Sequence, residues 1–325
     1  MSKKLGVKNI YVKDESKRFK LNAFKGLGAS YAISQSLIKN PEIKTFCTAT
    51  DGNHGRAVAW AAKINGRKAI IYVPKETTLK RIQAIEKYGA KVIQINGHYD
   101  QACEEAKKIS FSKKWCLIQD KAWEEYIEIP ALILSGYLTL FKEMEDTIHD
   151  SLKPKIDLVF LQAGVGSMAA AGIYYYLNRY GKNKPKIVII QPEEADGILC
   201  SFKENKISSS KGSLKTIMAG LNCETPSLGA WDLLKNGTNY VLRISDDYAK
   251  QAMRELYYPQ ASDNRIISGE SGAAGLGGLI AILKESKIKS IKEDLRINNF
   301  TNILFINSEG DTDEEVFLEI INSNI

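Results

Sequence analysis

The chain has 325 residues, 44% of them hydrophobic and 26% charged, and its formal net charge is +7. This is the composition of a soluble globular protein with enough residues for one large or two ordinary domains. Its basic residues stand in short runs with acidic residues nearby, such as 287–292 between Glu285 and Glu293, and without interleaved aromatic residues, which argues against a nucleic-acid partner. No apolar run reaches about 18 residues, so no membrane span is expected.

The N-terminus lacks the apolar stretch that directs secretion, so the cytoplasm is the expected compartment. The five cysteines lie at positions 47, 103, 116, 200 and 223, without the spacing of a metal site. We therefore expect no metal and interpret the cysteines as small buried hydrophobic residues. A disulfide between Cys200 and Cys223 stays open as the less favoured alternative.

Strand-like runs alternate with helical patterns along nearly the whole chain. The predicted strands are 9–12, 45–49, 68–73, 91–95, 116–118, 156–161, 186–190, 240–244 and 302–307. The predicted helices are 29–37, 56–64, 78–88, 99–111, 130–148, 169–177, 246–256 and 271–283, with a closing helix after 312. A serine-rich stretch at 208–212 is interpreted as a mobile loop. The alternation predicts an α/β protein with mostly parallel sheets, whose ligands bind beyond the carboxyl ends of the strands.

One lysine stands out, at the point where the first loop runs into a helix. Lys25 follows Phe24 and precedes Gly26 and Gly28. In a partly desolvated pocket its neutral amine would be favoured and able to attack a carbonyl group. Taken alone, a solvated surface charge is the favoured interpretation of this lysine, so a functional role depends on the other loops.

A glycine-rich turn follows the apolar strand at 156–161. It contains Gly164, Val165, Gly166, Ser167 and Met168 and leads into a helix. Backbone amides that converge at a helix N-terminus form a cradle for an anion such as phosphate, and the Ser167 hydroxyl could donate one more hydrogen bond. Tight packing between helix and sheet remains the alternative interpretation.

Two further loops carry polar side chains at strand ends. In the first, Asn53 is suited to hydrogen-bond a ligand, whereas Asp51 is either a functional carboxylate or a helix N-cap. We interpret the adjacent His54 as a structural residue. In the second loop, Ser308 presents a hydroxyl suited to a heterocyclic nitrogen, or caps the last helix.

These motifs together resemble the fold type II pyridoxal-phosphate enzymes of the tryptophan synthase β and threonine dehydratase kind. Within that family the similarity is greatest to the ammonia-lyases that act on 2,3-diaminopropionate. It covers nearly the whole chain and rests on the segments 13–16, 21–25, 49–56, 119–120, 122–124, 162–168, 217–221, 268–273 and 308–313. The resemblance implies two domains with the cofactor between them: a small mobile domain at 30–144, and a large domain formed by 1–29 and 145–325.

The resemblance also assigns roles to the cofactor-binding residues. Lys25 would hold pyridoxal 5'-phosphate as a Schiff base, Asn53 would contact its 3-hydroxyl, and Ser308 would meet its pyridine nitrogen. The loop from Gly164 to Met168 would bind its phosphate. A neutral partner such as Ser308 leaves the pyridine nitrogen unprotonated, which limits the ring as an electron sink.

Catalysis would then rest on one lysine and two carboxylates. Lys25 would take the α-proton from one face of the substrate, and Asp51 would take it from the opposite enantiomer. Asp120 would attract the second ammonium group. The implied reaction converts D- and L-2,3-diaminopropionate to pyruvate and two ammonia, in an enzyme whose expected partners are a small amino-acid substrate and a second copy of the chain.

Two alternatives to this reaction remain open. The first is a dehydratase-like lyase that acts on serine, threonine or another small amino acid. The second is a shortened, inactive relic that still binds the cofactor, because the family's usual segment before residue 8 has no counterpart here.

Overall fold

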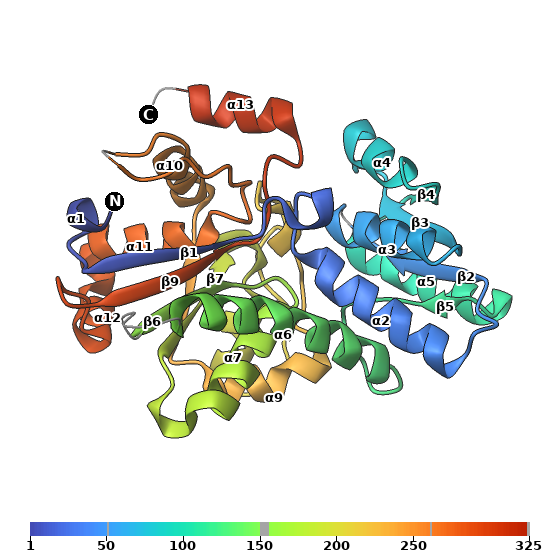
Figure 1. Ribbon diagram of the computed structural model, residues 1–325, viewed down its shortest axis with the longest axis horizontal. Helices are drawn as coiled ribbons and strands as arrows, with labels where there is room; N and C mark the ends of the chain where they lie inside the picture. The colour runs from blue at the N-terminus through green and yellow to red at the C-terminus, as the bar shows by residue number, and fades with distance from the viewer. Residues whose placement is uncertain (51, 150–155, 261, 324–325) are drawn as a thin grey trace.

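The computed structural model describes residues 1–50, 52–149, 156–260 and 262–323, and its strands form two parallel sheets (Figure 1). The larger sheet has the strand order β1-β9-β6-β7-β8, and the smaller has the order β4-β3-β2-β5. The strands are β1 Asn9–Asp14, β2 Thr45–Ala49, β3 Lys68–Pro74, β4 Lys91–Ile95, β5 Cys116–Leu117, β6 Leu158–Gln162, β7 Lys186–Pro192, β8 Tyr240–Ile244 and β9 Asn302–Asn307. All seven pairings between these strands are parallel, which confirms the predicted α/β class.

Helices cover both faces of each sheet. They are α1 Ser2–Leu5, α2 Lys25–Lys39, α3 Asn53–Ile64, α4 Leu79–Glu86, α5 Tyr99–Lys113, α6 Glu128–His149, α7 Ser167–Tyr180, α8 Gly197–Glu204, α9 Leu228–Gly237, α10 Asp246–Tyr257, α11 Ala274–Lys284, α12 Lys289–Leu295 and α13 Glu314–Asn322. Helices α1, α8, α9 and α12 were not predicted. Helix α6 begins at Glu128, so Pro130 lies in its first turn and does not open it.

The central strand β6 shows why the larger sheet is covered on both sides. All five of its residues are buried. Alternate side chains point to opposite faces of a strand, so Val159 and Leu161 pack into the core shared with α6 and α7, while Leu158 and Phe160 pack into the core shared with α10 and α11. An apolar strand of this kind needs a helical layer on each face.

The strands of the smaller sheet lie between residues 45 and 117, within the predicted small domain at 30–144. Helix α3 packs on one face of this sheet and α5 on the other (Figure 1). The limits of that domain and its mobility stay predictions.

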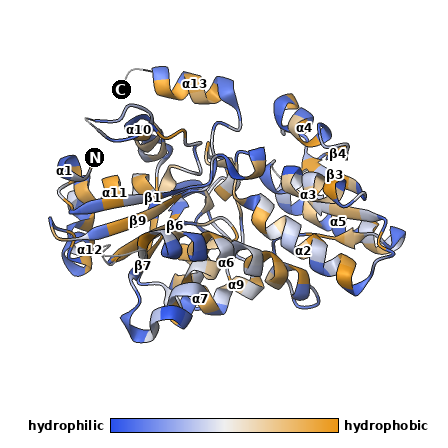
Figure 2. Ribbon diagram, viewed as in Figure 1, coloured by the Kyte–Doolittle hydropathy of each residue, from blue (hydrophilic) through white to orange (hydrophobic). Residues whose placement is uncertain are grey.

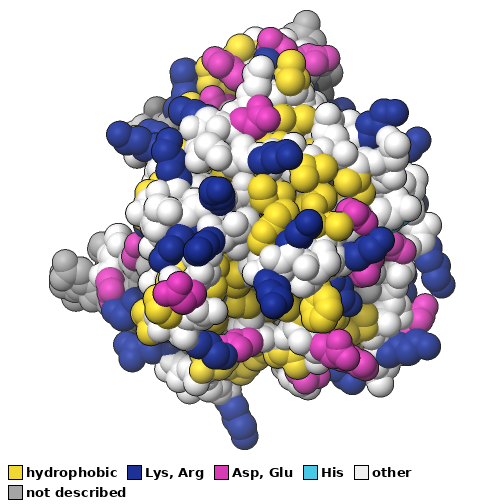
Figure 3. All heavy atoms as spheres, turned by 90° about the vertical axis from the view of Figure 1, so that its right-hand side faces the viewer, with side chains coloured by type: hydrophobic (Ala, Val, Ile, Leu, Met, Phe, Trp, Pro, Cys, Tyr) yellow, Lys and Arg dark blue, Asp and Glu magenta, His cyan; other side chains and the backbone are white. Residues whose placement is uncertain are grey.

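Apolar residues concentrate on the strands and on the inner faces of the helices, as Figure 2 shows. None of the helices in the described part of the chain has the length and apolar character that a membrane span requires. On the face drawn in Figure 3, basic side chains are interspersed with acidic and apolar ones and do not form a continuous stripe.

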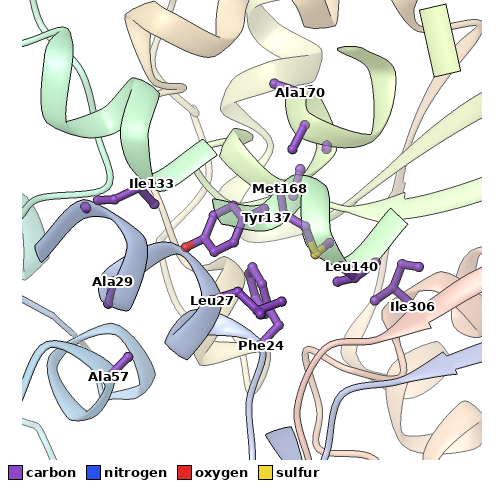
Figure 4. Close-up of a cluster of buried hydrophobic side chains, with 14 of the residues drawn as sticks. Phe24, Leu27, Ala29, Ala57, Ile133, Tyr137, Leu140, Met168, Ala170 and Ile306 are labelled. Atoms are coloured by element: carbon purple, nitrogen blue, oxygen red, sulfur yellow. The ribbon is translucent and has the colours of Figure 1, made fainter. Parts of the chain in front are cut away.

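Helices α2 and α6 approach each other closely, which fixes the start of α2. A Cβ at Gly136 would lie 2.5 Å from the carbonyl oxygen of Leu27, so only glycine fits this crossing. The rings of Phe24 and Tyr137 pack with their centroids 4.8 Å apart, and Ile133 lies beside them in the same cluster (Figure 4). The residue that follows Phe24 is thereby held by a rigid helix pair.

Candidate functional site

A pocket lies where the carboxyl ends of strands from both sheets meet. Its walls come from the segments that follow β2, β5, β6 and β9, together with the start of α2. The empty space within it, open mouth included, is about 1080 Å³. This is the place where parallel α/β sheets bind ligands.

Lys25 lies in this pocket as the first residue of α2, four residues before the predicted helix start. The preceding segment has left-handed backbone conformation at Phe19, Lys20 and Asn22, with φ of 52°, 60° and 54°. Such conformations are costly for residues other than glycine and persist only where the surroundings impose them. Here the Phe24 amide donates to the carbonyl oxygen of Ser308 at 3.1 Å, which ties the lysine segment to the loop after β9.

The Lys25 ammonium forms an ion pair with Asp120. Nζ lies 2.5 Å from Oδ2, and the two side chains are 17% and 5% exposed. Burial lowers the pKa of Lys25, but the Asp120 carboxylate outweighs burial and raises that pKa above its ordinary value. The expectation of a favoured neutral amine is therefore wrong for the cofactor-free chain, because it left out a carboxylate that lies 95 residues away in sequence.

The pair holds Asp120 in its charged form. Burial raises the pKa of this carboxyl group, but the charge of Lys25 and the hydrogen bonds from Lys25 and Tyr99 outweigh burial and lower the pKa below its ordinary range. The Tyr99 hydroxyl donates to Asp120 Oδ1 at 3.4 Å and itself accepts a hydrogen bond from Gln119 Nε2 at 2.8 Å. Asp120 thus presents Oδ2 towards the lysine.

The glycine-rich turn forms the predicted cradle at the start of α7. Gly166 has a φ of 93°, and a Cβ there would lie 2.7 Å from Leu234 Cδ1. The backbone N–H groups of 164–167 have no acceptor among the described residues and line the pocket. Orphan amides at a helix N-terminus suit a phosphate group.

The hydroxyl of Ser167 is used elsewhere, contrary to the expected extra contact with an anion. It donates to the backbone carbonyl oxygen of Asp120 at 2.9 Å. Ser167 can therefore contribute its backbone amide to a phosphate, but not its hydroxyl.

Ser308 is buried in the pocket wall, at the end of β9. Gln162 Nε2 donates to its Oγ at 2.9 Å and to the carbonyl oxygen of Ile306 at 2.8 Å. Since Oγ accepts this hydrogen bond, the Ser308 proton is left to donate into the pocket. This geometry fits the unprotonated nitrogen of a heterocycle.

Asn53 begins α3 and lines the same pocket. Arg56 donates to its Oδ1 at 2.8 Å, and its Nδ2 donates to the carboxylate of Glu309. These two contacts fix the orientation of the amide and leave one N–H for a ligand oxygen. Glu309 and Arg56 received no role from the sequence, although both lie in segments that carried the resemblance.

The buried His54 was interpreted as structural, and one of its ring nitrogens has a structural contact. Nε2 lies 2.7 Å from the carbonyl oxygen of Ile118, at the end of β5. Burial lowers the pKa of His54 below 6.5, so the ring stays neutral.

Asp51 lies outside the described residues, so its role stays a prediction.

The five cysteines, Cys200 and Cys223 included, are free thiols, which does not support the alternative of a disulfide. Within the described ranges, no three His, Cys, Asp or Glu side chains are grouped so as to hold a metal ion.

Lys25, Asn53, Ser308 and the 164–167 amides fit pyridoxal 5'-phosphate. They offer, around one pocket, an amine for its aldehyde, a donor for its 3-hydroxyl oxygen, a donor for its nitrogen and a cradle for its phosphate. The backbone N–H groups of 164–167 are the strongest evidence for this fit, because N–H groups in folded proteins normally have acceptors and these have none among the described residues.

Comparison with known proteins shows the family. Residues 1–298 match the family model described as "Pyridoxal-phosphate dependent enzyme". The chain is 40% identical to diaminopropionate ammonia-lyase of Escherichia coli (strain K12), over 97% of this chain and 83% of the relative. It is 36% identical to the Salmonella typhimurium enzyme of the same name, over 99% of this chain and 85% of the relative.

The fold agrees as well. The crystal structure of Escherichia coli diaminopropionate ammonia lyase in complex with an aminoacrylate-PLP azomethine reaction intermediate superposes with a TM-score of 0.93 at 40% identity. The alignment covers 99% of this chain and 85% of that structure. A maize serine racemase, at 22% identity and a TM-score of 0.77, shares the fold. The chain belongs to the pyridoxal-phosphate-dependent enzymes of fold type II and, among them, to the diaminopropionate ammonia-lyase family.

Proposed function

We propose that this enzyme eliminates the β-amino group of D- and L-2,3-diaminopropionate and releases pyruvate and two molecules of ammonia. The elimination leaves 2-aminoacrylate, which one water molecule converts to pyruvate and the second ammonia. The observation that carries the proposal is the buried Asp120 carboxylate beside Lys25, supported by the identity to the named relatives.

Pyridoxal 5'-phosphate, when bound, withdraws electrons from the substrate's α-carbon and so makes its proton removable. The chain's own residues bind and orient this group. The 164–167 amides hold its phosphate, Ser308 donates to its nitrogen, and the amide of Asn53, oriented by Arg56 and Glu309, donates to its ring oxygen.

Two residues are proposed to move the α-proton. Lys25 lies in the pocket wall, where its free amine takes the proton from one face of the substrate. Asp51 is proposed to act on the opposite face and so to admit the other enantiomer.

Asp120 favours an amine over a hydroxyl as leaving group. A carboxylate that stays charged in a buried site attracts an ammonium group, whereas a neutral β-hydroxyl gains less from it. The dehydratase-like reaction on serine or threonine therefore remains the second candidate. The predicted homodimer and the predicted cytoplasmic location are retained as parts of the proposal.

The test is pyruvate release from D- and L-2,3-diaminopropionate, with D- and L-serine as competing substrates. Wild type is compared with Lys25→Ala, Asp51→Asn and, as a matched control on an exposed lysine of the same loop, Lys17→Ala. We expect Lys25→Ala to abolish turnover, Lys17→Ala to retain it, and Asp51→Asn to lose mainly one enantiomer.

Two outcomes would contradict the proposal. Faster turnover of serine than of either diaminopropionate enantiomer would establish the dehydratase-like reaction. A wild-type protein that binds the cofactor and converts none of these substrates would establish the inactive relic.

A further inference from the structure

The two ring nitrogens of His54 have very different surroundings. Nε2 faces the carbonyl oxygen of Ile118 at 2.7 Å, and because a carbonyl only accepts, Nε2 carries the ring's proton. Nδ1 is then a bare acceptor. It is buried and has no hydrogen-bond partner among the described residues.

A second acceptor faces this nitrogen. Asp120 Oδ2 lies 3.9 Å from His54 Nδ1, and both side chains line the pocket. Two acceptors cannot hydrogen-bond to each other, and buried polar atoms without a partner are rare in folded proteins. The space beside these two atoms therefore suits a group that carries several N–H donors and a positive charge.

The neighbouring groups of the pocket agree with a cation at this place. In the cofactor-free chain the Lys25 ammonium donates to Asp120 Oδ2 at 2.5 Å. The Tyr99 hydroxyl donates to the other oxygen, Oδ1, so Oδ2 is the oxygen left for a ligand. Lys25 is not an ammonium while it is bonded to the cofactor or while its free amine serves as the base, so Oδ2 then lacks its ammonium partner and can accept from another one.

We propose that His54 Nδ1 and Asp120 Oδ2 together bind the side-chain ammonium of the substrate, which makes His54 a specificity-determining residue of this enzyme. The inference rests on the proposed function and adds a residue to it. An ammonium group has three N–H donors and can serve both acceptors at once. A β-hydroxyl has a single proton and leaves one of the two acceptors unpaired, which is costly in a buried site.

Two substitutions of His54 separate binding from structure. In His54→Gln the amide nitrogen takes the place of Nε2 and keeps the hydrogen bond to Ile118, but no acceptor remains where Nδ1 was. In His54→Asn the amide reaches only the place of Nδ1, where its oxygen can accept, and the hydrogen bond to Ile118 is lost. A purely structural His54 predicts that the glutamine variant is the better enzyme, whereas the proposal predicts the reverse.

The assay compares two substrates on the holoenzyme of each variant. Diaminopropionate has an ammonium leaving group, and β-chloroalanine has a leaving group without any N–H donor. For His54→Gln we expect kcat/KM to fall roughly 10- to 100-fold for diaminopropionate, the loss of one hydrogen bond to a charged group, and to change little for β-chloroalanine. For His54→Asn we expect the ratio of the two kcat/KM values to stay near that of wild type.

Several outcomes would overturn the inference. One is an equal fall for both substrates in His54→Gln, and another is unchanged turnover of diaminopropionate by that variant. If wild type converts β-chloroalanine but not diaminopropionate, the proposed function itself fails. If wild type converts diaminopropionate and His54→Gln loses activity equally on both substrates, only the proposed role of His54 fails, and the proposed function stands.

A measurement on wild type covers the case in which the variants do not fold. Ammonium chloride should compete with β-chloroalanine, because ammonium has the N–H donors that the two acceptors require. Tetramethylammonium chloride at the same ionic strength has no such donor and should not compete. Equal inhibition by the two salts would contradict the proposed binding site.

Discussion

Replacement of Asp120 by asparagine tests the electrostatic logic of the pocket in the cofactor-free chain. The substitution keeps the shape of the side chain and removes its charge, which leaves the Lys25 ammonium without its partner at 2.5 Å. Both side chains are largely buried, and breaking a buried pair by removing one partner costs about 3–5 kcal/mol. We expect the free energy of unfolding at neutral pH to fall by up to that amount.

The pH range of this loss follows from the direction of the two pKa shifts. The pKa of Lys25 is raised above 10.5, so its contribution is present below that pH and is lost as the pH rises through the folded-state value. The pKa of Asp120 is lowered below 3.8, so its contribution is present above that pH and is lost as the pH falls through the folded-state value. The destabilisation should therefore be nearly constant from about pH 5 to about pH 9.

The same substitution should change how the cofactor is captured. Only the neutral amine of Lys25 attacks an aldehyde, and Asp120 holds that amine in its charged form. Without the carboxylate, burial alone acts and lowers the pKa of Lys25, so the rate of cofactor capture should reach its maximum at a lower pH than in wild type.

Denaturant unfolding of the cofactor-free protein and the pH profile of cofactor capture, followed by absorbance, measure the two effects. Asp100→Asn is the matched control, because Asp100 pairs with Lys121 at 2.7 Å outside the pocket, where both side chains are more exposed. It should cost about 1 kcal/mol or less and leave the capture profile unchanged. The reasoning is refuted if Asp120→Asn unfolds like wild type and captures the cofactor with the wild-type pH profile.

Three further predictions follow from the site. Gly166→Ala places a Cβ against Leu234 at positive φ and should weaken cofactor binding at least about tenfold, whereas Gly66→Ala, also at positive φ but in open space, should leave the cofactor Kd unchanged. Ser308→Ala removes a donor to the cofactor and should lower kcat roughly tenfold at saturating cofactor, so an unchanged kcat would exclude the proposed contact with the ring nitrogen. Burial and the nearby Glu309 carboxylate raise the pKa of Glu270 from 4.5 to about 7, so the wild type should lose stability as the pH rises from about 4.5 to about 7. Glu270→Gln removes this loss and should be more stable than wild type by about 3 kcal/mol at pH 8 in denaturant unfolding, and equal stability at that pH would contradict the raised pKa.

The fold could be predicted wherever a local pattern determined the structure. Strands β2, β4, β8 and β9 begin and end where the alternation of residue types places them. Helices α8 and α9 were missed, and each carries glycine, a poor helix former, at one end. The left-handed conformations at Phe19, Lys20 and Asn22 could not be predicted either, since no glycine marks them.

The predicted site residues in the described part of the chain line one pocket, but the hydrogen bonds and ion pairs between them were not predicted. The hydrogen bond between Asn53 and Glu309 joins positions 256 residues apart, and the ion pair of Lys25 with Asp120 joins positions 95 residues apart. A sequence pattern reports which side chains follow a strand. It does not report which of them lie within hydrogen-bond distance of one another. The close contact of Lys25 with Asp120 raises the pKa of Lys25, whereas burial alone would lower it.

The position of Asp120 links loading of the cofactor to choice of substrate. A carboxylate that is buried and charged requires a cation beside it at every stage, because an unpaired buried charge is costly. Lys25 supplies that cation while the pocket lacks the cofactor. When Lys25 is bonded to the cofactor, Asp120 needs a cation from another ligand. A substrate with a second ammonium group supplies that cation, whereas serine does not. The preference for a diamino acid then arises from the same ion pair that slows capture of the cofactor at neutral pH, so Asp120→Asn should speed the capture and weaken the preference together.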